Sequence, residues 1–409
     1  MNDLPVSVVV VSRGRPDRLK LCLAGLSFLF YDAYEIVVVA DAAGLAAVAE
    51  AGLADLVKTV PFETPNISAA RNAGIAQAAG EVVAFIDDDA VPEPMWLAHL
   101  AAPFARAEVG AAGGFVRGRN GITFQYRARS VDGAAQARPL DVDPAQVTLL
   151  RPAQGRAIKT EGTNMAVRRD LLARIGGFDP SYRFFLDETD LNMRLARTDQ
   201  LTAIVPLAEV HHAYAPSSRR RADRAPRDLS EKAASLAVYL GRYCPKDAQP
   251  ALWSDLRREE RQNALRHMVA GRLEPRDVKR LLASFDAGRE EGAARRPVPM
   301  PAIPHAREGF RPFFTRARGA EVLAGRVWEG GRLRRAAAAR AAEGKIVSLF
   351  LFSHTTLYHQ VRLEAPGIWV QSGGLWGRST RSGRAVQPAT FASRLEREVR
   401  RVSWQRGNS

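Results

Sequence analysis

The protein has 409 residues, of which 46% are hydrophobic and 25% are charged. This length exceeds what one compact core usually fills, so two or three domains are expected, and the composition excludes a disordered chain. No apolar run approaches the ~18 residues typical of a membrane span, and the N-terminus lacks the basic segment and apolar core of a signal peptide. The two cysteines, Cys22 and Cys244, are far apart and form no metal or disulfide pattern. A reducing cytoplasm is therefore the expected location.

Positive charge is concentrated in the C-terminal half. The chain has 59 basic and 44 acidic side chains, which give a formal net charge of +15. Residues 1–212 hold 21 basic and 25 acidic side chains, so the remaining residues hold 38 and 19. Such a basic half suits nucleic acid, anionic lipid head groups or a phosphate-bearing substrate. A solvated basic surface that aids solubility explains the charge equally well.

The first hundred residues alternate between two kinds of segment. Runs rich in β-branched residues predict strands, and the segments between them place apolar residues at helical spacing. Strands that alternate with helices predict a mostly parallel sheet with helices on both faces, which is an α/β fold. The strands are expected at residues 6–11, 35–40, 56–60 and 81–86, and the helices at 17–29, 45–51, 67–79 and 94–104.

Beyond residue 115 the pattern changes. Residues 117–157 show no clear period and are expected to form a long surface excursion, which in enzymes often shapes a binding site. A Pro-rich break at 296–301 separates Arg- and Ala-rich helical segments from a C-terminal part with short strands. The later elements are expected as a regular segment at 162–167, helices at 169–175 and 189–197, and strands at 201–205, 347–352, 356–363 and 368–371.

Three consecutive acids, Asp87, Asp88 and Asp89, follow the fourth strand. Ligands bind at the carboxyl ends of the strands in an open parallel sheet, and adjacent carboxylates repel each other unless a cation offsets them. Carboxylate oxygens suit Mg²⁺ or Mn²⁺, and Mg²⁺ usually completes its shell with water and phosphate oxygens, which points to a nucleotide diphosphate. Alternatively, Asp89 caps a turn while its neighbours face water.

Two further polar side chains follow strands of the same sheet. Asp41 stands just past the second strand, where a carboxylate either accepts hydrogen bonds from a base or ribose or caps the next helix. The helix that opens near Asn66 is expected to direct its first-turn N–H groups and Arg71 toward an anion. Arg71 is alternatively a structural cation that pairs with the nearby acids.

Five motifs occur in order along the chain: 6–15, 66–74, Phe85-Ile86-Asp87-Asp88-Asp89, Gly162-Thr163-Asn164-Met165-Ala166 and Phe185-Leu186-Asp187-Glu188-Thr189-Asp190-Leu191-Asn192-Met193-Arg194-Leu195. Over about residues 5–215, this ordered set resembles a family 2 glycosyltransferase of the Rossmann-like GT-A fold. The resemblance implies inverting transfer of a sugar from a UDP-, GDP- or dTDP-linked donor to a glycan or lipid-linked acceptor in polysaccharide biosynthesis. It also implies that a divalent metal, Mg²⁺ or Mn²⁺, assists the transfer.

The resemblance implies roles for individual residues. It maps Asp87 and Asp89 onto the outer acids of the family's Asp-X-Asp motif, which hold metal and donor phosphates. The family's histidine that joins this shell is matched loosely by both His211 and His212, and His212 is taken as the metal ligand. Two adjacent histidines leaving a strand are by default one packed and one exposed side chain. The donor contacts expected are Ser12, Arg15, Asp41, Arg71, Asp87, Asp88 and Asn164.

Inversion requires a base on the face of the sugar opposite the leaving diphosphate, and it requires no covalent nucleophile. The family usually carries Glu-Asp where this chain carries Asp187-Glu188, so the alignment places the base at Glu188, with Asp187 as the alternate. Asp187 followed by Asp190 also resembles a capping arrangement at a helix start. Two features of this chain depart from the family's pattern at positions expected to contact the donor. The loop after the first strand reads Ser12-Arg13-Gly14-Arg15, which differs from the family's loop. Asp41 lies one residue later than the family's usual acidic position after the second strand.

We expect four parts in the chain. These are a GT-A catalytic domain at residues 1–225, a basic helical extension at 226–295, a Pro-, Arg- and Ala-rich linker and helix at 296–345, and a small β-rich C-terminal domain at 346–409. In the last part, Trp369, Trp376 and Trp404 are expected in a small hydrophobic core; stacking of these rings on sugars is the alternative.

Two other functions fit parts of the sequence. A sugar nucleotidyltransferase shares the sheet and the acids but is expected to show a Gly-rich phosphate loop after the first strand, which residues 12–16 do not provide. A non-catalytic basic protein that binds anionic surfaces or nucleic acid is less consistent with the sequence, because the basic segments show no recognisable nucleic-acid module. Nucleic acid is therefore not expected as a partner. The expected location is cytoplasmic, with peripheral contact at the inner face of the membrane.

Overall fold

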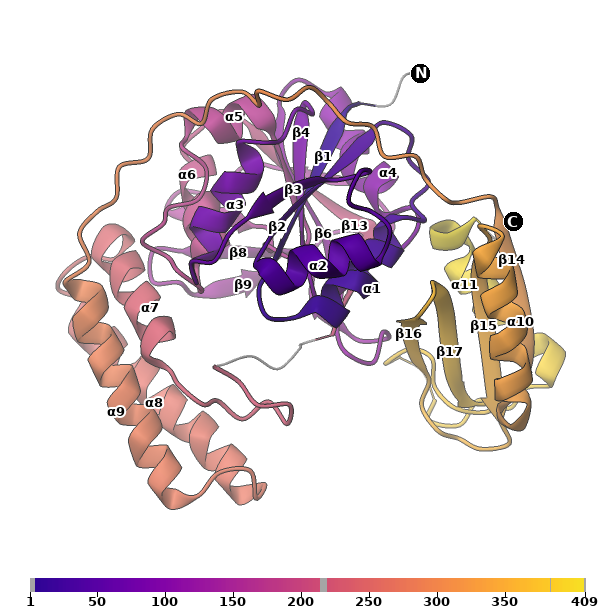
Figure 1. Cartoon of the computed structure of the whole chain (residues 1–409). Helices are drawn as coiled ribbons and strands as arrows, with labels where there is room; N and C mark the ends of the chain where they lie inside the picture. Colours follow the sequence, from indigo (N-terminus) through magenta and orange to yellow (C-terminus); the bar gives the residue numbers. More distant parts are fainter. Residues whose placement is uncertain (1–3, 214–218, 383, 408–409) are drawn as a thin grey trace.

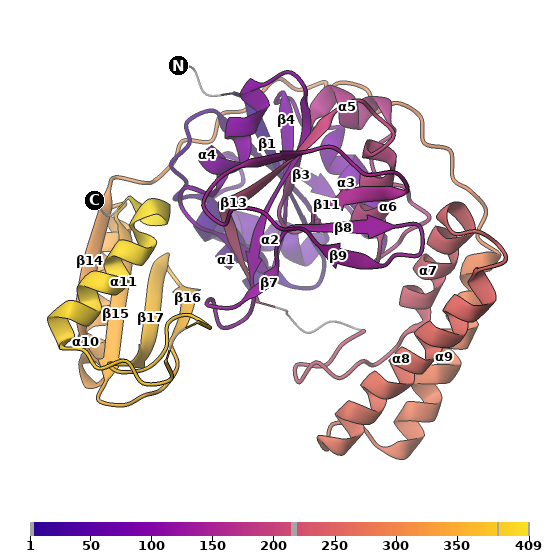
Figure 2. The same cartoon turned by 180° about the vertical axis from the view of Figure 1, so that it is seen from behind.

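The computed structural model describes residues 4–213, 219–382 and 384–407. An α/β domain occupies the centre, and two smaller parts flank it on opposite sides (Figures 1 and 2). One is a helical extension made of α7 to α9, and the other is a C-terminal unit that begins at residue 320. No helix within the described ranges combines the length and the apolar character that spanning a membrane requires.

The main sheet of the α/β domain follows the order β10-β13-β6-β12-β4-β1-β2-β3, and β5 and β7 pair beside this path. Strands β3, β2, β1 and β4 are parallel to one another, as predicted. The strands are β1 (Val6–Ser12), β2 (Tyr34–Ala40), β3 (Lys58–Pro61), β4 (Val82–Asp87), β5 (Ala90–Pro92), β6 (Val109–Arg117), β7 (Phe124–Tyr126), β10 (Thr148–Leu150), β12 (Met165–Arg168) and β13 (Leu201–His212).

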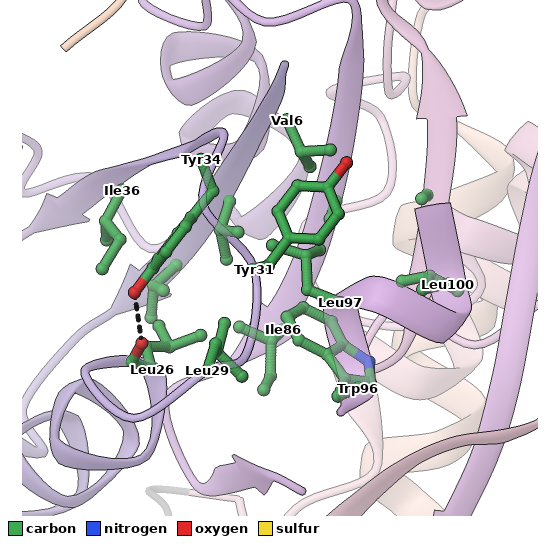
Figure 3. Packing of buried hydrophobic residues seen from close by; sticks show 14 of the residues in the cluster. Val6, Leu26, Leu29, Tyr31, Tyr34, Ile36, Ile86, Trp96, Leu97 and Leu100 are labelled. Carbon is green, nitrogen blue, oxygen red and sulfur yellow. Dashed lines mark hydrogen bonds between the residues drawn. The ribbon is translucent and has the colours of Figure 1, made fainter. Parts of the chain in front are cut away.

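Helices cover both faces of this sheet, because its central strands are unbroken apolar runs that bury side chains in both directions. Val6 of β1 packs on one face in a cluster with Tyr34 and Trp96 (Figure 3), whereas Val9 packs on the other face with Phe178. The predicted α/β fold is therefore confirmed. The helices are α1 (Pro16–Leu26), α2 (Ala42–Glu50), α3 (Ile67–Ile75), α4 (Trp96–Ala101), α5 (Arg169–Arg174) and α6 (Asp187–Leu195).

Residues 117–157 were expected to be an irregular excursion, and this expectation was wrong in part. The segment supplies β7 and β10 to the main sheet, and it supplies most of a second sheet of order β11-β8-β9. These are β8 (Arg129–Asp132), β9 (Ala137–Pro139) and β11 (Arg156–Lys159), all antiparallel. Strands of three or four residues with polar side chains are too short to show a two-residue period in the sequence.

The helical extension contains α7 (Ser230–Tyr243), α8 (Gln249–Val269) and α9 (Pro275–Ala293). Tyr239, Trp253 and Phe285 belong to its own buried cluster. Two glycines of α9 allow α7 to approach closely, because a Cβ atom on Gly288 would lie 2.0 Å from the Ser230 carbonyl oxygen. The extension is attached to the α/β domain through α6, as described below.

The C-terminal unit has a four-stranded sheet of order β14-β15-β17-β16. Its elements are β14 (Ala320–Arg326), α10 (Gly330–Ala342), β15 (Ile346–Ser353), β16 (Gln360–Glu364), β17 (Ile368–Gly374) and α11 (Phe391–Arg406). The boundary expected at residue 346 is therefore corrected: β14 and α10 come from the segment expected as linker and helix, since β14 pairs in parallel with β15. The unit is α/β and not only β-rich.

The three tryptophans of this part have different environments. Trp369 is 3% exposed and packs between the C-terminal unit and the α/β domain, whereas the Trp404 side chain is 74% exposed. Trp376 is half-buried against Leu375 and Phe391. The expectation of one small core that contains all three rings was therefore wrong for Trp404.

Candidate functional site

The three consecutive acids lie at the carboxyl end of β4, and their side chains have different partners. Asp88 is fully buried; it accepts a hydrogen bond from Ser12 Oγ at 2.7 Å and pairs with Arg15 at 2.8 Å. Burial raises the pKa of Asp88 to about 7, against the opposing effect of Arg15. Ser12 is also buried. Asp88 and Ser12 therefore hold the loop after β1 in place. The donor contacts expected from these two residues stay predictions.

Asp87, Asp89 and His212 form the candidate metal site. One carboxylate or imidazole ligand atom from each lies within 4.8 Å of the other two. His212 Nε2 is 3.1 Å from Asp89 Oδ1, and its Nδ1 is 3.0 Å from Gln125 Oε1, which fixes the orientation of the ring. Two carboxylates and an imidazole are a donor set that fits a divalent cation such as Mn²⁺. The adjacent His211 points away from the cluster and contacts Glu93.

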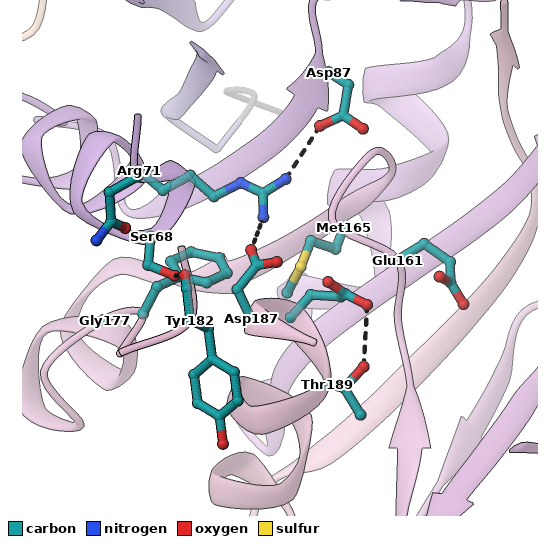
Figure 4. Close-up of polar contacts among 12 residues, drawn as sticks. Ser68, Arg71, Asp87, Glu161, Met165, Gly177, Tyr182, Asp187 and Thr189 are labelled. Atoms are coloured by element: carbon teal, nitrogen blue, oxygen red, sulfur yellow. Dashed lines mark hydrogen bonds and ion pairs between the residues drawn. The ribbon is translucent and has the colours of Figure 1, made fainter. Parts of the chain in front are cut away.

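Arg71 connects this cluster to the second acidic group. Its side chain is 5% exposed, and its guanidinium pairs with Asp87 at 3.1 Å and with Asp187 (Figure 4). A Cβ atom on Gly162 would lie 2.6 Å from Nη2 of Arg71. A glycine at this position therefore leaves the space that the guanidinium occupies.

Asp187 and Glu188 begin α6, after Leu186 in a left-handed conformation with φ of 66°. The Asp187 side chain is 5% exposed and faces Arg71, whereas the Glu188 side chain is 18% exposed. Glu188 Oε1 accepts hydrogen bonds from Lys159 Nζ at 2.8 Å and from Thr189 Oγ1 at 3.0 Å. Lys159 outweighs the effect of burial and holds the pKa of Glu188 below its usual range, so this carboxylate is ionised at neutral pH.

Two other predicted donor contacts are engaged in the protein scaffold. Asp41 caps α2 by accepting from Gly44 N at 2.9 Å, and it also accepts from Gly14 N at 2.7 Å. Asn164 is fully buried; it donates to the carbonyl oxygens of Phe115 and Ala208 and accepts from Trp96 Nε1. Asn164 therefore joins β12 to β6 and β13, and the contact with the donor that was expected from it stays a prediction.

A comparison with known families supports the motif assignment. Residues 7–176 match the family model described as glycosyl transferase family 2. The chain contains a family 2 glycosyltransferase domain. The resemblance stated for the sequence motifs is thus confirmed, although the match ends before Asp187, Glu188 and His212.

Several curated proteins are similar to the chain over part of their length. An O-antigen biosynthesis protein, RfbC of Myxococcus xanthus, is 26% identical over 243 residues, which cover 54% of this chain and 18% of that protein. An N-acetylglucosaminyl-diphospho-decaprenol L-rhamnosyltransferase of Mycobacterium tuberculosis is 35% identical over 71 residues, 17% of this chain and 23% of that protein. The probable glycosyltransferase YdaM of Bacillus subtilis is 26% identical over 212 residues, 48% of this chain and 47% of that protein. The chain spans less than half the length of each.

The solved structures that resemble the chain include the following two. One is GalNAc-T7 with UDP, GalNAc and Mn²⁺, with a TM-score of 0.40 and 16% identity over 59% of this chain and 48% of that chain. The other is a mannosyltransferase from Pyrobaculum calidifontis in complex with GDP-Man and Mn²⁺, with a TM-score of 0.43 and 20% identity over 73% of this chain and 77% of that chain.

The glycosyltransferase domain is joined to the helical extension at the helix that carries Asp187 and Glu188. Asp190 of α6 is fully buried and accepts from Arg242 at 2.6 Å and from Tyr243 at 2.8 Å, both on α7. Arg194 pairs with the same carboxylate at 2.8 Å. Asp190 therefore serves the fold, and α7 fixes the position of α6.

The glycosyltransferase domain is also joined to the C-terminal unit, next to the candidate metal site. Arg406 of α11 is fully buried and binds both carboxylate oxygens of Glu93, at 2.8 and 2.9 Å. The same Glu93 carboxylate contacts His211 Nε2 at 2.8 Å, and the His211 ring lies 4.8 Å from that of Trp369. This buried set holds the end of β13 immediately before His212.

Sequence reasoning missed the residues that complete the site from outside the motifs. Gln125 lies in the segment 117–157 that shows no clear period, Lys159 lies just after that segment, and Arg406 lies in a helix that was not expected. A carboxylate pair as buried as Asp187 and Glu188 requires nearby cations. That requirement is the sequence signal that predicts cations near the pair, but it does not identify which residues supply them.

Proposed function

We propose that the protein is an inverting, metal-dependent glycosyltransferase that moves a sugar from a nucleotide-diphosphate donor to an acceptor hydroxyl. The observation that carries this proposal is the single buried arginine between the two acidic groups. Arg71 touches Asp87 of the candidate metal site and Asp187, the neighbour of Glu188. A site for the leaving diphosphate and a site for the base thus lie on either side of one guanidinium.

Asp87, Asp89 and His212 are proposed to hold the divalent cation, which when bound neutralises charge on the diphosphate as it leaves. Arg71 and Arg15 supply further positive charge beside these carboxylates; Arg15 Nη1 is 3.3 Å from Asp89. The two carboxylate oxygens of Asp41 accept hydrogen bonds from Gly14 N and Gly44 N, and so hold the loop after β1 next to the start of α2. The nucleoside of the donor is expected at this edge of the sheet. Both solved structures described above were obtained with Mn²⁺, which is consistent with this set of ligands.

Glu188 is proposed as the base that takes the proton of the acceptor hydroxyl. Of the two adjacent carboxylates it is the more exposed, and Lys159 keeps it ionised, which is the protonation state that a base requires. Asp187 is directed at Arg71 instead and is proposed to position that guanidinium. This division of roles assigns base and positioning residue to neighbouring positions of α6.

The acceptor is proposed to be a glycan or a lipid-linked glycan. A relative named as acting on N-acetylglucosaminyl-diphospho-decaprenol and another named as an O-antigen biosynthesis protein support this class. The peripheral contact with an anionic membrane, expected from the basic C-terminal half, stays a prediction.

The proposal is tested by incubating the purified protein with a panel of UDP-, GDP- and dTDP-linked sugars. Release of the nucleoside diphosphate is measured with Mn²⁺, with Mg²⁺ and with a chelator. We expect slow hydrolysis of at least one donor with a divalent cation and none with the chelator. A protein that neither binds nor hydrolyses any member of the panel contradicts the proposal.

A further inference from the structure

A cleft of about 910 Å³ lies between the glycosyltransferase domain and the C-terminal unit. The domain contributes α1, the turn between β6 and β7, and the end of β13, including His212. The C-terminal unit contributes β16, from Gln360 to Leu363. Because His212 also contacts Asp89, the cleft opens directly beside the candidate metal site.

The charges around this cleft have one sign. Five arginines line it, and among the residues that the structure describes no aspartate or glutamate does. All five side chains are exposed. A cleft lined by one sign of charge between low-dielectric walls concentrates ions of the opposite sign. The arginines are Arg18, Arg119, Arg224, Arg362 and Arg381.

Three of these cations are not neutralised by the protein itself. Within the described parts of the chain, Arg18, Arg119 and Arg381 form no ion pair with a carboxylate, although Arg381 donates to Thr123 Oγ1 at 3.2 Å. Arg362 pairs with Glu364 at 2.8 Å. Arg15 and Arg71, which are proposed to face the donor phosphates, do not line the cleft, so its positive charge is additional to theirs.

The floor of the cleft is apolar. Val91, Val361 and Leu363 are at most 7% exposed and pack in one cluster, which Leu21 of α1 joins. Arginines at the rim and an apolar floor suit a ligand with an anionic group joined to an apolar or neutral one.

We propose that this cleft binds the phosphate or diphosphate group of the acceptor, so that the acceptor of this enzyme is a phosphate-bearing molecule. This inference rests on the proposed function, because it takes the neighbouring metal site as the place where the donor sugar is released. The phosphate group would be held by arginine side chains from both parts of the molecule. The C-terminal unit is then part of the acceptor site.

The experiment measures binding of two probes by calorimetry in a chelator at low ionic strength. The probes are inorganic pyrophosphate and geranyl diphosphate, with geraniol as the uncharged comparison. Without a divalent cation, Asp87 and Asp89 repel anions, so binding at the metal site is suppressed. We expect the wild-type protein to bind both diphosphates and the Arg18→Gln/Arg119→Gln variant to bind them at least about tenfold more weakly, because each guanidinium gives a charge-assisted hydrogen bond.

The matched control is Arg261→Gln/Arg335→Gln, which makes the same change of charge at two exposed arginines outside the cleft. It should bind both probes like the wild type. Equal binding by the two double variants, or no binding of pyrophosphate by the wild type, overturns the inference. Tighter binding of geranyl diphosphate than of pyrophosphate identifies a lipid-linked acceptor, and equal binding identifies a soluble one. Failure of the proposed function shows separately, as a wild-type protein that binds no nucleotide sugar with Mn²⁺.

Discussion

Arg71 shows how much of this site depends on single residues. It is buried, it pairs with one carboxylate from each acidic group, and Gly162 leaves it room. The strand-end acids could be predicted from the sequence because a buried apolar run followed by acids marks the edge where ligands bind. The buried positions of Asp88 and Asn164 could not be predicted, because a motif gives residue type and order but not the direction of a side chain.

The division of roles between Glu188 and Asp187 is tested by one isosteric substitution at each. Glu188→Gln keeps the shape but cannot accept a proton, so kcat should fall by about 10²–10⁴-fold while donor affinity stays unchanged. Asp187→Asn weakens the hold on Arg71, so donor affinity should fall together with kcat. Steady-state kinetics and equilibrium binding of the donor separate the two patterns. A normal kcat for Glu188→Gln would remove it as the base.

At the scale of elements, burial on both faces decides which strands the sequence reveals. Strands β1, β2 and β4 are β-branched runs covered by helices on both sides, and they were predicted within a residue or two. The short strands β8, β9 and β11 pair outside the main sheet, and β14 is a half-exposed edge strand. Helix α11 buries Arg394 and Glu398 as well as Val402, so its buried face does not read as apolar in the sequence.

This buried polar layer under α11 makes the C-terminal unit sensitive to pH. His359 Nδ1 accepts from Gln371 at 2.8 Å, and Arg394 lies 2.8 Å from its Nε2. Burial lowers the pKa of His359 from 6.5 to about 4. The unfolded chain therefore takes up the proton first as the pH falls, and the stability present above pH 6.5 is lost as the pH falls toward 4.

Between pH 7 and pH 5, His359 should reduce the free energy of unfolding of the C-terminal unit by about 2 kcal/mol. Urea unfolding followed by tryptophan fluorescence at both pH values measures the loss. In the His359→Gln variant, the fall in the free energy of unfolding between pH 7 and pH 5 should be about 2 kcal/mol smaller than in the wild type. His305→Gln, at an exposed histidine, should behave like the wild type. Identical pH dependence in all three proteins would show that His359 does not titrate in this way.

At the scale of the whole molecule, the C-terminal unit is connected to the candidate metal site by buried charges. Arg406 and Glu93 form a bidentate pair, and Glu93 also holds His211, the neighbour of His212. The sequence did not predict this contact, since the two residues are 313 positions apart. Only the folded arrangement of the two parts brings them together.

Arg406→Lys should therefore loosen both the attachment of the C-terminal unit and the binding of Mn²⁺. Lysine keeps the charge but loses the two parallel hydrogen bonds to Glu93. Removing one partner of a buried ion pair costs about 3–5 kcal/mol of stability, so this conservative change should cost less than that. Thermal unfolding and Mn²⁺ titration measure the two effects. Arg400→Lys, on the exposed side of the same helix, is the matched control and should change neither. An Arg406→Lys protein with unchanged Mn²⁺ affinity would show that the attachment does not position His212.

The central claim is that Asp87, Asp89 and His212 hold a divalent cation together with the diphosphate of the donor. The most direct measurement is calorimetric titration of UDP, GDP and dTDP into the protein with Mn²⁺ and with a chelator. We predict that at least one nucleotide binds with Mn²⁺, and that the chelator or Asp89→Asn weakens this binding by at least about tenfold, or 1.4 kcal/mol. Asp55→Asn, at an exposed aspartate, should bind like the wild type. Binding that is equally tight with Mn²⁺, with the chelator and in Asp89→Asn would contradict the account.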